Sequence, residues 1–212
     1  MTDADSVSKR AMCERCLRAQ SSCICGWIRS LKPAAQVLIL QHPLEVAQAK
    51  GSGRLLHLSL EGSVRAQGAQ FDEEVLRELL FSEAEGVPVQ PVLLYPHTPG
   101  EPESPLPDLS TPQRLRLVIL DATWRKSRKM LHLNPLLQAL PRLPLIDPPA
   151  SQYRIRKAHR ADQLSTLEAA CHALAQLESE HAKYLPLLQA FDGFVAQQSS
   201  YIPTETFNDP QA

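Results

Sequence analysis

The fold class is decided by the stretch Leu115-Arg116-Leu117-Val118-Ile119-Leu120-Asp121-Ala122-Thr123-Trp124. Its apolar run is typical of a strand buried on both faces of a sheet, and it ends abruptly at Asp121. In open α/β sheets, ligands bind outside the carboxyl ends of the strands, which is where this run delivers its polar side chains. Asp121 is therefore either a functional residue or the cap of the helix that follows it.

Other segments alternate between strand patterns and helix patterns. Short apolar runs at 37–40, 92–95 and 143–146 indicate further strands. Apolar residues at helical spacing predict helices near 55–60, 71–81, 165–179 and 183–198, a basic helix that begins at about 124, and a further helical turn around 135–140. This alternation predicts an α/β fold with a mostly parallel sheet and helices on both faces.

Length and charge bound the class of protein. The chain has 212 residues and a formal net charge of −1, which suits one globular domain with a small appendage. No apolar run approaches the roughly 20 residues that cross a bilayer, and the N-terminus lacks the pattern of a signal peptide. We therefore expect a cytoplasmic protein whose cysteines are reduced thiols.

Four of the five cysteines form the cluster Cys13-x2-Cys16-x6-Cys23-x-Cys25. Four thiolates satisfy tetrahedral zinc, and the Cys-x2-Cys pair suits the tight turn that brings two sulfurs to one ion. We expect structural zinc, with an iron–sulfur cluster or no metal as the alternatives. Cys171 lies inside an apolar helix pattern, where a buried, inert thiol is expected.

Two more segments carry polar groups where an element begins or ends. Gln41-His42-Pro43-Leu44-Glu45 follows the run 37–40 and repeats the pattern seen at Asp121. Ser165 and Glu168 fit a capping box, which would mark the start of the helix 165–179. A helix N-terminus also binds carboxylates and phosphates, so a structural and a binding role both remain open for Ser165-Thr166.

In order along the chain, four elements resemble the DTW-domain family: the cysteine cluster, His42-Pro43-x-Glu45, Asp121-x-Thr123-Trp124 and Ser165-Thr166-x-Glu168-Ala169. Members of that family transfer the 3-amino-3-carboxypropyl group of S-adenosylmethionine to N3 of a tRNA uridine. The resemblance also implies a SPOUT-like fold with a C-terminal trefoil knot, although periodicity does not indicate a knot. One departure is Gly51-Ser52 where family members tend to carry Asn-Thr, so contacts from this loop are not carried over.

The resemblance also implies roles for individual residues. Asp121, Thr123 and Trp124 would be catalytic, with Asp121 as the base for N3 and Trp124 either stacking on a base or lying in the core. Zinc would be structural and S-adenosylmethionine the co-substrate. The residues expected to bind S-adenosylmethionine are Gln41, His42, Glu45, Arg156, Lys157, Ser165, Thr166 and Glu168. Arg156 and Lys157 could instead contact RNA phosphates.

The expected organisation is a disordered segment 1–10, a zinc-binding segment 11–30 and a DTW (SPOUT-like) catalytic domain 31–212. The expected partners are S-adenosylmethionine and a tRNA modified in its variable loop or D-loop, with no membrane and a monomer by default. The basic cluster Arg125, Lys126, Arg128 and Lys129 would contact phosphates. The rival interpretations are a SPOUT-type tRNA or rRNA methyltransferase and a non-catalytic, zinc-stabilised RNA-binding module.

Overall fold

The computed structural model describes residues 11–83, 86–97, 105–147 and 164–201. A five-stranded sheet with the order β2-β1-β4-β3-β5 lies at its centre, and each pair of neighbouring strands is parallel. The sheet confirms the α/β prediction. The strands are β1 (Gln36–Gln41), β2 (Val64–Gln67), β3 (Gln90–Leu94), β4 (Leu115–Asp121) and β5 (Arg142–Leu143).

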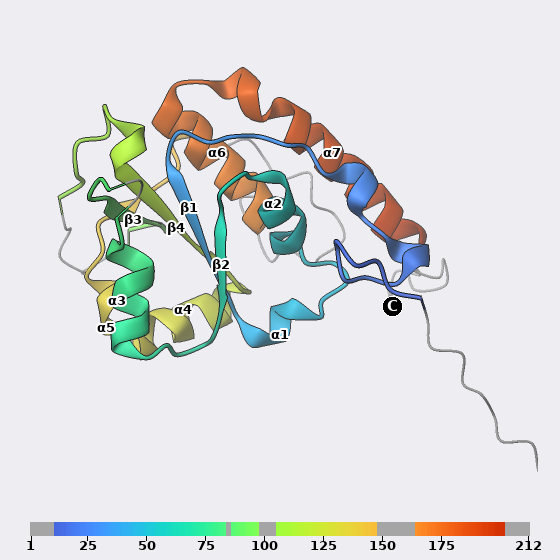
Figure 1. The fold of residues 1–212 in the computed structure, drawn as a ribbon, viewed down its shortest axis with the longest axis horizontal. Helices are drawn as coiled ribbons and strands as arrows, with labels where there is room; N and C mark the ends of the chain where they lie inside the picture. Colours follow the sequence, from blue (N-terminus) through green and yellow to red (C-terminus); the bar gives the residue numbers. More distant parts are fainter. Residues whose placement is uncertain (1–10, 84–85, 98–104, 148–163, 202–212) are drawn as a thin grey trace, which may run out of the picture.

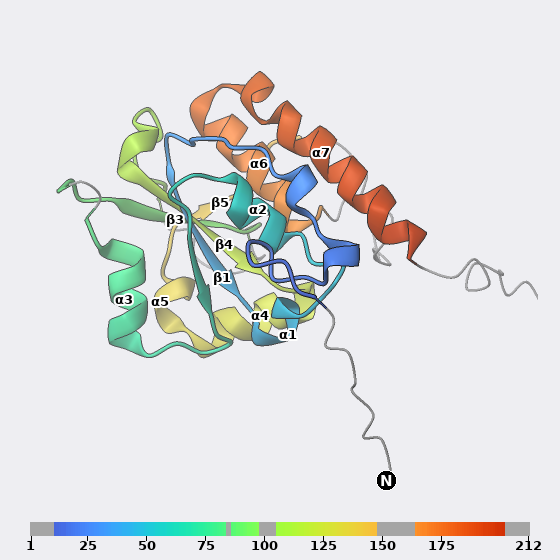
Figure 2. The same cartoon turned by 45° about the vertical axis from the view of Figure 1, so that its right-hand side comes forward.

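Helices cover both faces of the sheet, as predicted (Figures 1 and 2). One face packs against α2, α6 and α7, and the other against α3, α4 and α5. The helices are α1 (Pro43–Val46), α2 (Gly53–Ser59), α3 (Glu73–Phe81), α4 (Trp124–Leu133), α5 (Pro135–Gln138), α6 (Thr166–Glu178) and α7 (His181–Ser200). Within the described residues, no helix combines the length and apolarity that crossing a bilayer requires.

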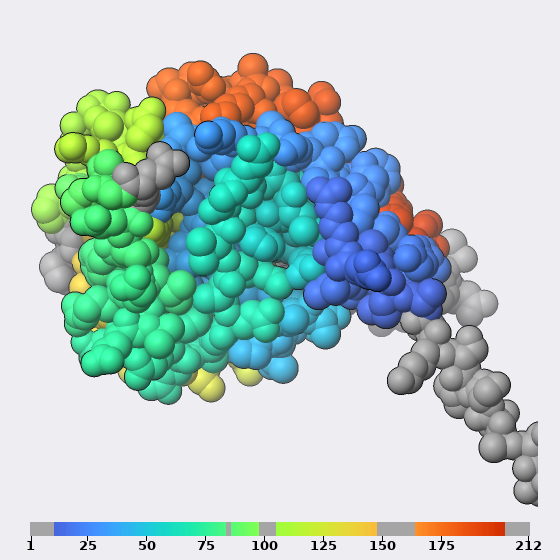
Figure 3. Space-filling view, viewed as in Figure 1, coloured from blue at the N-terminus to red at the C-terminus, as the bar shows by residue number. Residues whose placement is uncertain are grey.

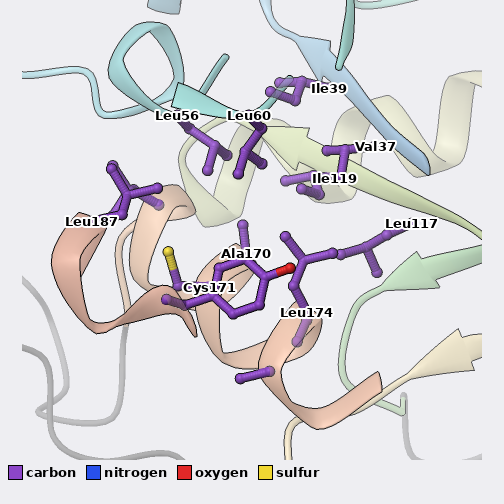
Figure 4. Close-up of a cluster of buried hydrophobic side chains, with 14 of the residues drawn as sticks. Val37, Ile39, Leu56, Leu60, Leu117, Ile119, Ala170, Cys171, Leu174 and Leu187 are labelled. Carbon is purple, nitrogen blue, oxygen red and sulfur yellow. The ribbon is translucent and has the colours of Figure 1, made fainter. Parts of the chain in front are cut away.

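The two central strands supply both halves of the core because successive side chains point to opposite faces. Val37 and Ile39 of β1 pack on the side of α2 and α6, where Figure 4 shows them above Ala170 and Leu174. Leu38 and Leu40 pack on the side of α3 and α4. This double burial explains why β1 and β4 read as continuous apolar runs and not as alternating patterns.

The ends of β1 and β4 lie at the same level, since Gln41 pairs with Asp121 in the parallel register. After β1 the chain crosses one face through α2 to reach β2, and after β4 it crosses the other face through α4 and α5 to reach β5. The two connections therefore leave neighbouring strands, β1 and β4, toward opposite faces of the sheet, which makes the ends of these strands a topological switch point. Such a switch point, at the carboxyl ends of the strands, is where open α/β sheets bind ligands.

Some elements differ from the sequence-based expectation. The strand β2 was not expected, because its residues are half-exposed at the sheet edge and show no apolar run. The last strand is only two residues long, and α1 adds a single helical turn after β1. The expected trefoil knot depends on 148–163, and the expected disordered terminus is 1–10; both segments lie outside the described residues.

Candidate functional site

Asp121 is the last residue of β4, and its buried carboxylate accepts hydrogen bonds from two other elements. Gln41 Nε2 donates to Oδ2 over 2.7 Å, and Thr166 Oγ1 donates to Oδ1 over 2.7 Å. Arg65 of β2 donates to Gln41 Oε1 over 3.0 Å, which orients the amide so that its NH2 group faces Asp121. The network thus joins β2, β1, β4 and α6 at one carboxylate.

The loop before α2 closes over the same carboxylate. A Cβ atom on Gly53 would lie 2.1 Å from Asp121 Oδ2, so only glycine fits at this position. Ser52 is buried, and its Oγ accepts a hydrogen bond from Leu167 N over 3.3 Å. Neither residue was among the expected site residues. The Gly-Ser-Gly sequence was the available signal, since glycine often marks close approach of the backbone.

The start of α6 lies on the other side of the Asp121 carboxylate from Gln41. Ser165 Oγ accepts from Glu168 N over 3.2 Å, and Glu168 Oε2 accepts from Ser165 N over 2.7 Å, which confirms the predicted capping box. Thr166 is the first residue of the helix and directs its hydroxyl to Asp121. The positive end of the helix dipole therefore faces a buried carboxylate, which stabilises the negative charge.

Asp121 does not cap the helix that follows it. The N-cap position of α4 is Thr123, whose side chain makes no cap hydrogen bond, and the Asp121 oxygens bond to Gln41 and Thr166. The interpretation of Asp121 as a helix cap is therefore wrong. The carboxylate instead belongs to the polar network at the strand ends.

Trp124 is 44% exposed, so the alternative of a core tryptophan is wrong. Its ring meets the buried ring of Tyr95 edge to face, with 5.7 Å between centroids. Arg142 lies over the same tyrosine ring, 5.5 Å from its centroid. Tyr95 immediately follows β3, so it also lies at a carboxyl strand end, and its position in the sequence could have revealed it.

His42 and Glu45 lie at the end of β1 and are both buried. His42 Nδ1 accepts from Leu44 N over 3.1 Å and thereby caps α1, which places the proton of a neutral ring on Nε2. Burial, followed by the charge of Lys126, lowers the pKa of His42 below 6.5. Glu45 Oε1 accepts from Lys126 Nζ over 2.8 Å.

This ion pair changes the interpretation of the basic cluster. Lys126 is a partner of a buried carboxylate, whereas Arg125, Arg128 and Lys129 are exposed on α4. We therefore keep the expectation of phosphate contacts for Arg125, Arg128 and Lys129 and assign Lys126 to the ion pair with Glu45. Arg156 and Lys157 lie outside the described residues.

The four N-terminal cysteines converge as their spacing predicted. Their Sγ atoms all lie within 4.8 Å of one another, with 3.6 Å between Cys13 and Cys25 and 3.7 Å between Cys16 and Cys23. Zinc–sulfur bonds of about 2.3 Å in a tetrahedron place sulfurs about 3.8 Å apart, so the donor set fits zinc.

The pKa values of two of these thiols are shifted in opposite directions. Backbone N–H groups of Cys16 and Arg15 lower the pKa of Cys13 to about 6, whereas burial and the neighbouring sulfurs raise the pKa of Cys25 to about 12. Without a cation, close thiolates repel one another, which opposes the ionisation of Cys25. A bound dication would stabilise all four as thiolates, which is the form that ligates metal.

A small cavity of about 100 Å³ lies at the opposite end of the sheet, beside Gln36 and Arg116. The buried Arg116 guanidinium donates to Gln36 Oε1 and to the carbonyls of Leu79 and Ser82. These bonds join β4 to β1 and to the end of α3. Arg116 therefore has a structural role, and the candidate functional site is the polar network at the other end of the sheet, at the carboxyl ends of the strands.

Comparison with known protein families gives a match over most of the chain. Residues 10–199 match the family model of the DTW domain. The chain belongs to the DTW-domain family. The match runs from before the cysteine cluster to the end of α7, so it includes all four motifs that suggested the family.

Relatives of this DTW-domain protein share one kind of name. The tRNA-uridine aminocarboxypropyltransferase 2 of Drosophila melanogaster is 32% identical over 184 residues, which cover 83% of this chain and 70% of that protein. The enzyme of the same name from Mus musculus is 27% identical over 220 residues, covering 93% and 68%. The tRNA-uridine aminocarboxypropyltransferase A of Arabidopsis thaliana is 24% identical over 142 residues, covering 60% and 53%. No solved structure matches the chain.

Proposed function

We propose that this DTW-domain protein is a tRNA-uridine aminocarboxypropyltransferase, which attaches a 3-amino-3-carboxypropyl group to N3 of a uridine. The family membership and the names of the relatives support the reaction class. The observation that carries the proposal to this chain is the buried carboxylate of Asp121. It lies at a topological switch point, within hydrogen-bond reach of Gln41 and Thr166.

The donor proposed here is S-adenosylmethionine, whose sulfonium makes the attached aminocarboxypropyl carbon open to attack. Uridine N3 forms the new bond to that carbon, the carbon–sulfur bond breaks with its electron pair on sulfur, and 5′-methylthioadenosine leaves. The N3 proton must go to a base as the bond forms. We assign that role to Asp121, because an ionised carboxylate accepts protons and Gln41 and Thr166 hold it in one orientation.

The burial of Asp121 restricts which uridines can react. The residue is 4% exposed, so a base lying on the protein surface does not reach the carboxylate. N3 also belongs to the pairing edge of uracil, so the target must be unpaired and inserted into the site. Trp124, exposed three residues after Asp121 and supported by Tyr95, offers the stacking surface for such a base.

The start of α6 is proposed to receive the amino-acid end of the donor. Backbone N–H groups at a helix N-terminus bind carboxylates. The N–H groups of Leu167 and Glu168 already donate to Ser52 and Ser165, so the donors proposed for the carboxylate are the N–H of Thr166 and the hydroxyl groups at the start of the helix. Glu168 belongs to the same helix and closes its capping box with Ser165. Gln41, His42 and Glu45 remain proposed ligands of the donor from the end of β1 and from α1, and Thr123 remains a proposed catalytic residue beside Trp124. Arg156 and Lys157 remain proposed ligands of the same carboxylate or of RNA phosphates.

Two surfaces are proposed to complete the enzyme. The exposed Arg125, Arg128 and Lys129 of α4 would hold tRNA phosphates and position the RNA without reading its sequence. The four cysteines would hold structural zinc, because four thiolates leave no open coordination position for chemistry.

The experiment is nucleoside mass spectrometry of unmodified tRNA incubated with the purified protein and S-adenosylmethionine. We expect 3-(3-amino-3-carboxypropyl)uridine in the tRNA and 5′-methylthioadenosine in solution. Methyluridine together with S-adenosylhomocysteine would instead show a methyltransferase. Unchanged tRNA that is nevertheless bound would show a non-catalytic RNA-binding module.

A further inference from the structure

The side chain of Arg18 fastens the cysteine segment (residues 11–30) to the loop in front of α2. Arg18 lies between Cys16 and Cys23, and its Nη1 donates to the carbonyl of Ala49 over 2.6 Å. Its Nη2 donates to the carbonyl of Gly51 over 3.3 Å. The guanidinium also lies over the ring of Phe194 in α7, 5.4 Å from the centroid.

Arg18 itself is held by the turn that brings the cysteines together. Cys13 N donates to the Arg18 carbonyl over 2.7 Å, and Leu17 N donates to the Cys13 carbonyl over 2.8 Å. A second guanidinium connects the same two parts of the chain from the other side: Arg54 of α2 donates to the carbonyl of Arg15 in the cysteine segment over 2.9 Å. Figure 3 shows the segment directly beside the residues of α2.

The loop that Arg18 holds leads straight to the reaction site. Ser52 receives the Leu167 N–H at the start of α6, and Gly53 contacts the carboxylate of Asp121. Only Ser52 separates Gly53 from the carbonyl of Gly51 that Arg18 binds. A displacement of the Gly51 carbonyl is therefore passed to Asp121 through two residues of backbone.

We infer that Arg18 is a positioning residue for the transfer reaction, which couples the cysteine segment to the placement of Asp121. This inference rests on the proposed function. Arginine suits the role because its planar fork donates to two carbonyls at once, whereas the ammonium of lysine is a point charge on a flexible stem. Both terminal nitrogens of Arg18 are engaged by the loop, which argues against a phosphate contact.

Loss of these bonds would leave a glycine-containing loop with two carbonyls short of a donor. Gly51 and Gly53 have more accessible conformations than other residues, so the loop would become more mobile. A misplacement of about 1 Å can lower a reaction rate by about 100-fold even when the change is far from the reacting atoms. The loss should therefore appear in the single-turnover rate, with little change in the binding of tRNA.

The test compares Arg18→Met, Arg18→Lys and Arg29→Met. Arg29 is the matched control, because its side chain donates to the carbonyls of Gly26 and Ile28, within the same segment, and to no other group in the described part of the chain. Four quantities are measured for each protein: zinc content, hydrogen exchange of the peptide covering 48–58, single-turnover rate, and the salt dependence of tRNA binding. The wild-type protein is assayed in parallel.

For Arg18→Met we expect retained zinc, faster exchange at 48–53, a rate about 10- to 100-fold lower and an unchanged salt slope. Arg18→Lys should fall in between, and Arg29→Met should match the wild type. Wild-type exchange and rate in Arg18→Met would overturn the inference. So would an Arg18→Lys variant with full rate beside an Arg18→Met variant with a shallower salt slope, because that pattern identifies a phosphate contact.

Two controls distinguish a failure of this inference from misfolding of the variant and from a failure of the proposed function. If Arg18→Met loses zinc, the inference is tested by comparing Arg18→Lys with the wild type. Slower turnover with faster hydrogen exchange at 48–53 in Arg18→Lys would support the inference. Wild-type values of both quantities would overturn it. An inactive wild-type protein would contradict the proposed function, whereas an active wild type with a fully active Arg18→Met would contradict this inference alone.

Discussion

The hydroxyl of Thr166 donates a hydrogen bond to Oδ1 of Asp121 over 2.7 Å, joining the first residue of α6 to the last residue of β4. The two residues are 45 positions apart in the sequence. With the amide of Gln41 on the other oxygen, this bond fixes the plane of the carboxylate. A reactive group held in this way needs little reorganisation when a substrate arrives.

Replacing Thr166 tests the contribution of this bond. Thr166→Val keeps the shape of the side chain but removes the donor, whereas Thr166→Ser keeps the hydroxyl. We expect Thr166→Val to lower the free energy of unfolding by about 1 kcal/mol, the usual value of one hydrogen bond. We also expect the single-turnover rate to fall by about tenfold, or about 1.4 kcal/mol in activation free energy. Equal rates for the valine and serine variants would show that the bond does not orient the base.

Metal analysis tests the cysteine cluster. The purified protein should carry about one zinc per chain, and Cys13→Ser or Cys23→Ser should lose it, because each removes one of four ligands. Cys171→Ala is the control, since this thiol is fully buried in α6, away from the cluster. Metal content that stays the same in the two serine variants would exclude these cysteines as ligands.

The cations of α4 fall into two groups that mutation should separate. Changing Arg125, Arg128 and Lys129 together to glutamine should lower the log–log salt slope of tRNA binding by about three units, one for each phosphate contact. A slope equal to that of the wild type would show that these charges form only a solvated helix face.

Lys126→Gln should behave differently from the other three. It should leave the slope nearly unchanged but lower the free energy of unfolding by about 1–3 kcal/mol, because the buried Glu45 would lose its charged partner. Urea denaturation and salt titration measure the two effects. A shallower slope with wild-type stability would return Lys126 to the RNA-binding surface.

The buried His42 predicts a pH dependence of stability. Burial lowers the pKa of His42 in the folded protein below its value of 6.5 in the unfolded chain. Between the two values the unfolded state binds more protons, so the free energy of unfolding falls as the pH drops below about 6.5. It stops falling once the pH is below the folded pKa.

His42→Asn isolates this contribution, because asparagine also caps a helix but does not titrate. We expect the variant to resemble the wild type near about pH 8 and to lose less stability near about pH 5. The measurement is urea denaturation at both pH values. Parallel losses in the two proteins would show that His42 does not contribute to the acid sensitivity.

The sequence revealed most of the fold where burial leaves a clear pattern. The strands β1 and β4 were recognisable because both of their faces are covered, and the capping box of α6 follows from Ser165 and Glu168 alone. The edge strand β2 was not recognisable, because its four residues, Val64–Gln67, are only partly covered. A strand that is buried on both faces of the sheet leaves a clear apolar run in the sequence, whereas a half-exposed strand at the edge of the sheet does not.

The same distinction holds for the site. Asp121 was predicted from its place at a strand end, but the contact of Gly53 with its carboxylate depends on the packing of α2 against β1 and α6. The pairing of Lys126 with Glu45 joins residues 81 positions apart, so the lysine looked no different from its basic neighbours. Contacts of this kind are set by tertiary packing, which local patterns do not encode.

The most direct test of the account is the single-turnover rate of Asp121→Asn, measured together with tRNA binding and donor binding. Asparagine can accept from Gln41 and donate to the Thr166 hydroxyl oxygen, so the fold and both affinities should be kept, but it does not take up a proton. We expect a rate lower by about 10²- to 10⁴-fold, partly restored at high pH where the uridine ionises unaided. A near wild-type rate would remove Asp121 from the chemistry, and loss of S-adenosylmethionine binding would make it a ligand of the donor and not the base.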